Sequence, residues 1–231
     1  MQGVTLFNKF QQLYSASQQT PDVSLFTYAP GIDVLQADPR LATVSTDKLP
    51  SSNNIRENNI SLLSHLKTID LVLAPLQSQY DYILIDSHPE VSDVMRAIIY
   101  ASDYCVSPVK LDRQSSIGVA TVIGEIRTVN SDIVMVRRAL QIEDNYSNTK
   151  FAGAIGMMAR NYADDLKQSE QLEYNRLRSS GEIFNTYVTE GDGLRLAAAG
   201  RVSVYDINGA NANKQSSQFK EMTKEFLGVC S

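Results

Sequence analysis

Residues 80–89, YDYILIDSHP, decide which fold class we expect for the chain. Ile83, Leu84 and Ile85 form a continuous apolar run, which is typical of a strand buried on both faces of a parallel sheet. The run ends in Asp86, and an acid at the carboxyl end of a central strand lies where open α/β sheets bind ligands. We therefore expect a buried strand with Asp86 at the ligand-binding edge. The same residues also allow a strand that ends in a turn, with Asp86 capping the next helix.

The length, net charge and composition of the sequence limit the kinds of protein that it can encode. A length of 231 residues fits one α/β domain over residues 1–231. The net charge of −5 excludes a global basic field, so contact with nucleic acid would need a local patch. Cys105 lies in an apolar stretch, which predicts an inert buried thiol and fits a reducing cytosol. The sequence shows no signal peptide and no apolar run of membrane-spanning length, so we expect a cytoplasmic protein without a membrane partner.

Hydrophobic spacing and turn residues place the other elements. Strands are expected at 23–26, 32–35, 104–109, 151–158 and 183–188, with a short extended stretch at 202–205. Helices are expected at 1–19, 57–73, from 92 or 93, 118–129, 164–180, 194–199 and 217–227. Residues 133–136 suit a helix end or a short strand, and residues 137–150 are expected to form a surface insertion. Strands alternating with helices predict a mainly parallel sheet with helices on both faces.

Several stretches resemble one family in the same order. Residues 80–89 resemble the YDYIIIDCPP segment of the ParA/MinD-type partition ATPases, which have a deviant Walker A motif. Residues 97–108, AIIYASDYCVSP, are similar to the family's NALVAADEVLIP, and residues 31–38, GIDVLQAD, to its GLDLLPAN. Residues 151–158 resemble the next buried strand, and residues 183–206 the stretch ending in a VxxYD-like strand. The resemblance spans nearly the whole chain.

The resemblance implies a P-loop NTPase-like fold of the ParA type that binds ATP and Mg²⁺. Asp86 then corresponds to the Walker B aspartate, which helps to hold Mg²⁺ beside the phosphates. Asn161 and Thr189 follow strands at positions where the family binds its nucleotide. Family members also form homodimers, bind a ParB-like centromere-binding protein, and contact DNA without reading its sequence.

For DNA, the resemblance implies scattered basic residues that contact phosphates on one face. The candidates are Arg176, Arg178, Arg195 and Arg201, together with Lys167. The alternative is a solvated helix face, because Glu170 and Glu173 are interleaved with these residues.

The family's phosphate-binding loop has no counterpart in this sequence. That loop ends in Gly-Lys-Ser/Thr, and its backbone N–H groups and lysine hold the phosphates. The chain thus resembles a ParA protein without its first βαβ unit, through either a reading frame that starts late or a natural loss of nucleotide chemistry. We expect no ATP hydrolysis by this chain alone. His88, where the family has proline, is a candidate metal ligand or base, or else a turn residue.

Two functions follow as hypotheses. The first is the carboxyl-terminal bulk of an ATP-switched factor that segregates plasmids or chromosomes. The second is a non-catalytic module that binds a family partner or DNA without turnover. If the fold is right, Asp86, Lys110 and Asn161 should share one edge of the sheet. The missing strand should also leave an open sheet edge that favours a dimer or a bound partner.

Overall fold

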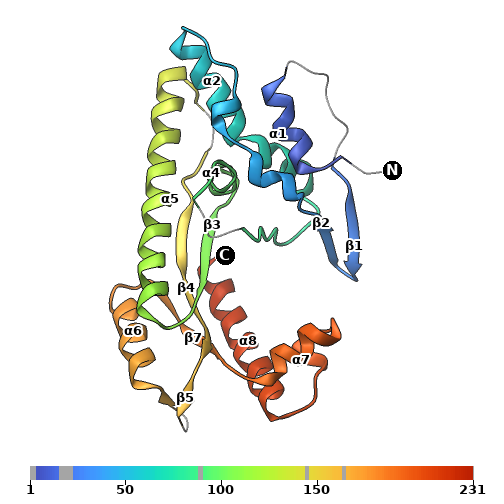
Figure 1. Ribbon diagram of the computed structural model, residues 1–231, viewed down its shortest axis with the longest axis vertical. Coiled ribbons are helices and arrows are strands. Elements are labelled where there is room, and N and C mark those ends of the chain that lie inside the picture. Colours follow the sequence, from blue (N-terminus) through green and yellow to red (C-terminus); the bar gives the residue numbers. More distant parts are fainter. Residues whose placement is uncertain (1–3, 16–22, 88–90, 144–145, 163–164, 231) are drawn as a thin grey trace. The chain divides into compact units, whose positions relative to one another are not determined.

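The structure is a computed structural model that describes residues 4–15, 23–87, 91–143, 146–162 and 165–230. The chain divides into two compact units, one of Met1–Asp103 with Glu125–Thr149 and the other of Tyr104–Gly124 with Lys150–Ser231. A long helix, α5 (Arg113–Leu140), contributes to both (Figure 1). The single-domain assignment stays a prediction, since two such units can belong to one domain.

The first unit is mostly helical, with one separate hairpin. The hairpin strands are β1 (Leu25–Ala29) and β2 (Ile32–Leu35). The helical elements are α1 (Leu6–Tyr14), η1 (Pro39–Thr43), η2 (Thr46–Lys48), α2 (Ile55–Leu66), α3 (Thr68–Leu73), η3 (Ala74–Leu76) and α4 (Asp93–Tyr100). Both hairpin strands and the start of α4 were predicted from the sequence. The expected helix over 57–73 is instead two helices, and the Ile60 side chain on the first of them is exposed.

The core of this unit forms where α1, α3 and α4 meet. Phe7 and Phe10 from α1 pack in one buried cluster with Ile69 of α3 and Ala97 of α4. The start of α4 is fixed by Ser92, whose hydroxyl accepts a hydrogen bond from the Met95 N–H at 3.2 Å. Such a cap satisfies one of the free N–H groups of the first turn, which is why Ser92 rather than a later residue begins the helix.

The predicted strand at residues 80–86 is wrong. These residues form neither helix nor strand in the structure, and the Leu84 side chain is 81% exposed. The apolar run has the propensity of a strand, but a strand also needs a neighbour to pair with its backbone groups. No strand among the described residues pairs with it. Residues 88–90, including His88, lie outside the described residues, so the hypotheses for His88 remain open.

His65 is fully buried in α2. Its Nε2 lies 3.2 Å from the Asp93 carbonyl oxygen, and its ring centroid lies 5.0 Å from that of Phe10. Its Nδ1 is buried and has no hydrogen-bond partner among the described residues. Burial therefore lowers the pKa of His65, although the Asp93 carbonyl opposes this and Arg96 adds to it.

This burial predicts a loss of stability in acid. The folded state keeps His65 neutral, whereas the unfolded chain takes up a proton near its ordinary pKa of about 6.5. The contribution of neutral His65 to the free energy of unfolding is therefore complete above that pH. It is lost as the pH falls toward the lowered pKa of the folded state, and the free energy of unfolding then changes by at most about 1.4 kcal/mol per pH unit. Urea unfolding between pH 5 and pH 8 (roughly the range in which histidine titrates) measures it. His65→Leu should remove this slope and His88→Gln should keep it; a slope unchanged in His65→Leu would contradict the assignment.

The second unit contains the parallel sheet. Its strands are β3 (Tyr104–Val109), β4 (Lys150–Ala159) and β7 (Ile183–Thr189), in the order β3-β4-β7 and all parallel (Figure 1). A small antiparallel pair, β5 (Asn161–Tyr162) and β6 (Asp165–Leu166), follows β4. The helical elements are α6 (Gln168–Ser179), α7 (Asp192–Gly200), η4 (Val204–Asp206) and α8 (Ala210–Val229). The predicted α/β class with a parallel sheet flanked by helices is confirmed.

Four predicted elements of the carboxyl-terminal half differ in whole or in part from the structure. Residues 133–136, and residues 137–140 of the expected insertion, belong to α5, which runs unbroken to Leu140. Val129, Ile133 and Val136 are buried at helical spacing, which explains the continuation. Residues 202–205 include the start of a 3₁₀ turn instead of an extended stretch, and the hairpin β5–β6 occupies part of the helix expected over 164–180.

The two edges of this sheet differ. At β7, the Glu225 carboxylate of α8 accepts hydrogen bonds from the backbone N–H groups of Asn185 and Thr186, at 2.6 and 3.0 Å. These contacts satisfy edge groups that would otherwise be free to pair with another strand. At β3, no strand of the described residues pairs on the side away from β4. Contacts from α8 therefore engage the β7 edge of the sheet, whereas at the other edge β3 has no paired strand among the described residues.

Candidate functional site

Polar residues lie together at the carboxyl ends of the parallel strands. This end of the sheet is distinct from its two lateral edges, which are β3 and β7. Ala159 at the end of β4 is the register partner of Thr189 at the end of β7. Lys110 follows β3 and Asn161 follows β4, so both leave the same end of the sheet, as expected. Asp86 follows no strand and belongs to the other compact unit, so its grouping with these two residues stays a prediction.

Thr189 is held by glutamines of α8. Its N–H and hydroxyl both donate to Gln218 Oε1, at 2.9 and 3.0 Å, and its carbonyl accepts from Gln215 Nε2 at 2.9 Å. Gln215 is 1% exposed, and its Oε1 accepts from the Leu194 N–H at the start of α7. These bonds fix the turn between β7 and α7. They also engage the N–H and hydroxyl that Thr189 would offer to a ligand.

The cation that follows β4 is paired as well. Arg160 donates from its Nε to Glu170 Oε1 at 2.5 Å, and its backbone N–H donates to Oε2 at 2.7 Å. The Glu170 carboxylate raises the pKa of the Arg160 guanidinium, and the more distant Glu190 and Asp112 act in the same direction. Glu170 is buried, which corrects the interpretation of this residue as part of a solvated face. The Arg160–Glu170 pair therefore joins the carboxyl end of β4 to α6.

The three residues predicted to hold ATP and Mg²⁺ have different surroundings in the structure. Asp86 lies in an exposed, irregular stretch, and no cluster of three acidic, histidine or cysteine side chains that could hold a metal ion occurs within the described ranges. Asn161 Oδ1 is buried without a hydrogen-bond partner in the part of the chain that is described, whereas the polar groups of Thr189 are engaged. Phosphate binding in this fold rests on a glycine-rich loop with a lysine, and the sequence has none.

The four arginines predicted to bind DNA all lie in the second unit. Arg176 pairs with Glu173 at 3.1 Å, and the Arg178 guanidinium lies over the Tyr174 ring at 5.9 Å. Arg195 contacts Glu190 at 3.1 Å and Asp192 at 3.6 Å. Arg201 is exposed at the carboxyl end of α7 in the left-handed backbone region, with φ 53°. Exposed ion pairs of this kind contribute little to stability, so Arg195 and Arg176 can exchange partners at small cost.

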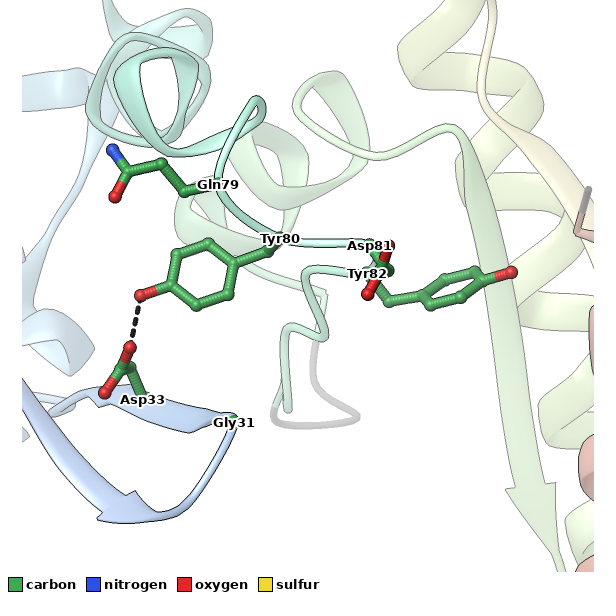
Figure 2. A pocket seen from close by; sticks show the side chains of 6 residues that line it. All are labelled: Gly31, Asp33, Gln79, Tyr80, Asp81 and Tyr82. Atoms are coloured by element: carbon green, nitrogen blue, oxygen red, sulfur yellow. Dashed lines mark hydrogen bonds between the residues drawn. The ribbon is translucent and has the colours of Figure 1, made fainter.

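A separate pocket lies in the first unit, beside the hairpin. It is a cavity of about 530 Å³ lined by Gly31 and Asp33 of the hairpin and by Gln79, Tyr80, Asp81 and Tyr82. Tyr80 reaches across it and donates a hydrogen bond from its hydroxyl to Asp33 Oδ2 at 2.6 Å, while the Tyr82 ring points away from Asp33 (Figure 2). Thr27 donates to the other oxygen of Asp33, and these two bonds lower the pKa of that carboxyl.

Neither this pocket nor the roles of Gln215, Gln218 and Glu170 could be predicted from the sequence. Gln215 and Gln218 fall at helical spacing with the apolar face of α8, which is a weak signal for a glutamine that binds backbone groups. Glu170 lies in the first turn of α6, where an acid is ordinary. Their partners are distant in sequence, so only the folded arrangement identifies them.

Comparisons with known proteins agree with the fold described. The family model for an AAA domain of the ParA/MinD-like type matches residues 27–142, half of the chain. A solved structure of a Cyanothece McdA variant in complex with ATP matches with a TM-score of 0.57 and 14% identity, covering 82% of this chain and 73% of that one. Apo McdA matches with a TM-score of 0.54 and 15% identity, covering 75% and 66%. At these identities the likeness concerns the fold.

No curated protein matches the sequence. No helix in the described ranges could cross a membrane.

Proposed function

Because the chain belongs to the ParA/MinD-like AAA domain family, we propose that it is a ParA-type segregation protein that positions plasmid or chromosomal DNA. The observation that carries the proposal is the family match over residues 27–142, which includes residues 80–86 and β3. The McdA structures support the same fold over most of the chain. A ParB-like protein, a second copy and nonspecific DNA are the partners that the proposal implies.

A segregation assay tests this function. The gene would be deleted in its host, and the fraction of cells that lose the replicon carrying it would be counted over successive generations. We expect loss to increase and to be reversed by the wild-type gene. Unchanged inheritance of both the replicon and the chromosome would contradict a role in segregation.

The non-catalytic module remains the second candidate, and one arrangement favours it. The groups at the carboxyl ends of β4 and β7 bind the protein's own helices, through Arg160 with Glu170 and Thr189 with Gln218. A chain with these contacts can bind partners without using ATP. Under this alternative, segregation still fails in the deletion strain, but the Asp86→Ala gene restores it fully.

Binding to DNA should be electrostatic and should depend on Arg201. Replacing Arg201 by glutamate puts an acid where a phosphate would lie, so affinity for duplexes of any sequence should fall by the same factor, roughly tenfold or more for a lost charge-assisted contact. Arg195→Glu should act in the same direction, although Glu190 and Asp192 already share that guanidinium.

Fluorescence anisotropy with two unrelated duplexes, over a series of salt concentrations, measures this effect. Arg56→Glu is the matched control, because Arg56 is an exposed arginine on α2 in the other unit. Equal affinities for Arg201→Glu, Arg56→Glu and the wild type would exclude Arg201 from the DNA contact, as would a clear preference for one duplex.

A further inference from the structure

The edge strand β7 contains a bulge. Ala154 and Gly156 of β4, which are two residues apart, pair with Ile183 and Tyr187 of β7, which are four residues apart. The extra residues of β7 have no register partner on β4, and a bulge of this kind bends the strand locally. Their backbone N–H and C=O groups therefore need partners outside the sheet.

Side chains of two helices bind the backbone groups of this bulge. The Glu225 Oε1 atom of α8 accepts hydrogen bonds from the N–H and the side-chain amide of Asn185, at 2.6 and 2.9 Å, and its Oε2 accepts one from the Thr186 N–H at 3.0 Å. The Tyr174 hydroxyl of α6 donates to the Asn185 carbonyl at 2.8 Å. Both backbone groups of Asn185 are thus bound to side chains, and neither is left for another strand.

Three features that protect edge strands coincide at this point. Natural sheets discourage pairing at an edge with bulges, with charged side chains on the edge and with a helix that covers the strand. In β7 the bulge, the Glu225 carboxylate and the helix α8 all act at Asn185 and Thr186 (Figure 1). Their coincidence indicates that the arrangement prevents β7 from pairing with a further strand.

The sequence of β7 explains why its edge needs protection. Residues 183–189 read IFNTYVT, in which all but one residue are β-branched or aromatic, and the segment holds no charged residue, glycine or proline. Segments of six or seven residues with this composition pair readily with identical segments of other chains. The strand that β7 fits best is therefore β7 of a second copy, in preference to an unrelated peptide.

The two halves of α8 are anchored differently. In the first half, Ala212 and Gln215 are buried. In the second half, residues 220–229, no side chain is buried, and Glu225 accepts the three hydrogen bonds from β7. Segments with few buried contacts open locally at a small cost in free energy. The second half of α8 therefore depends on Glu225 to stay on β7.

We propose that Glu225 guards the edge of β7, and that without this contact β7 pairs with β7 of a second copy of the chain. Two identical edges meet antiparallel about a two-fold axis, so each copy supplies the same backbone groups and the pairing closes as a dimer. Asn185 and Thr186 lie near the middle of β7 and hence near this axis. The second half of α8 acts as a strap whose release exposes the pairing edge.

Glu225→Ala in the full chain tests the proposal, because it removes the acceptor of all three hydrogen bonds. At low protein concentration, amide exchange of Asn185 and Thr186 should become roughly tenfold faster or more, the scale of a lost charge-assisted contact. At higher concentration the variant should associate more strongly than the wild type in sedimentation velocity. The same two amides should then become protected again, since pairing occupies them.

Glu221→Ala is the matched control. Glu221 is an exposed acid on the same helix, and it pairs with Lys224 at 2.7 Å instead of binding β7. This variant should keep the wild-type exchange rates at residues 185 and 186 and the wild-type association.

A second variant separates strand pairing from a loss of folding. Asn185→Lys, added to Glu225→Ala, places like charges opposite each other across the two-fold axis, so association should return to the wild-type level. Wild-type association of Glu225→Ala, an equal effect of Glu221→Ala, or association that persists with the added lysine would each overturn the proposal. So would amides of residues 185 and 186 that stay unprotected while Glu225→Ala associates.

Discussion

Gly193→Ala is expected to destabilise the second unit, because α7 and α8 approach each other too closely for a side chain at this position. An added Cβ would lie 2.6 Å from Ala212 Cα and 2.9 Å from Ala212 N, and it would also meet Gln215 Oε1. Two of these atoms belong to the backbone of α8, so the helix itself must shift. The shift would disturb Gln215, which binds the Leu194 N–H and the Thr189 carbonyl.

Overpacking of this kind typically costs about 1–3 kcal/mol, partly offset by the higher helix propensity of alanine. For a chain of this length, that lowers Tm by roughly 2–10 °C. Gly124→Ala is the matched control, because Gly124 lies inside α5 with open space around its Cα. There the same change should stabilise the helix by about 0.5–1 kcal/mol.

Calorimetry of both variants measures the change in Tm, which should fall for Gly193→Ala and rise for Gly124→Ala. A Gly193→Ala protein that melts at or above the wild-type temperature would contradict the close packing of α7 on α8.

Much of the parallel sheet could be predicted from local sequence. The apolar run of β3 is bounded by Asp103 and Lys110, and the predicted strand has the observed bounds. For β4 and β7, each observed boundary lies within one residue of the predicted one, because the apolar content of these strands marks them well. Burial on both faces gives such strands a signal that does not depend on knowing their neighbours.

The stretch that pointed to the fold class is also where prediction failed. Residues 80–86 have strand propensity, but the structure gives them no pairing partner, and Leu84 is exposed. Propensity is local, whereas a strand is defined by hydrogen bonds to another segment. The resemblance to the ParA/MinD family therefore identified the family correctly from a stretch that forms no strand here.

The candidate site depended still more on tertiary contacts. Asn161 and Thr189 could be placed near one sheet edge from strand order alone. That Thr189 is engaged by Gln218, and Arg160 by Glu170, depends on helices that pack from distant parts of the sequence. Charged residues on a helix give little sign of whether they face water or a strand end, and so the burial of Glu170 was missed.

The chain is expected to release no phosphate from ATP when purified alone. Phosphoryl transfer depends on positioning and charge stabilisation, which in this family come mainly from the Walker A backbone and its lysine. Losing one donor to a developing charge already costs ~10²–10³ in rate. Here the sequence contains no such loop, Asp86 lies in an exposed irregular stretch, and Arg160 and Thr189 are bound to the protein's own side chains.

These 231 residues form a ParA-type fold, and a phosphate-release assay tests our prediction that they hold no working phosphate site. Purified chain would be incubated with ATP, Mg²⁺ and duplex DNA, beside the Asp86→Ala variant. We expect both proteins to release phosphate at the rate of buffer alone. Turnover by the wild-type chain that disappears in Asp86→Ala would contradict it and would show that Asp86 serves a nucleotide site.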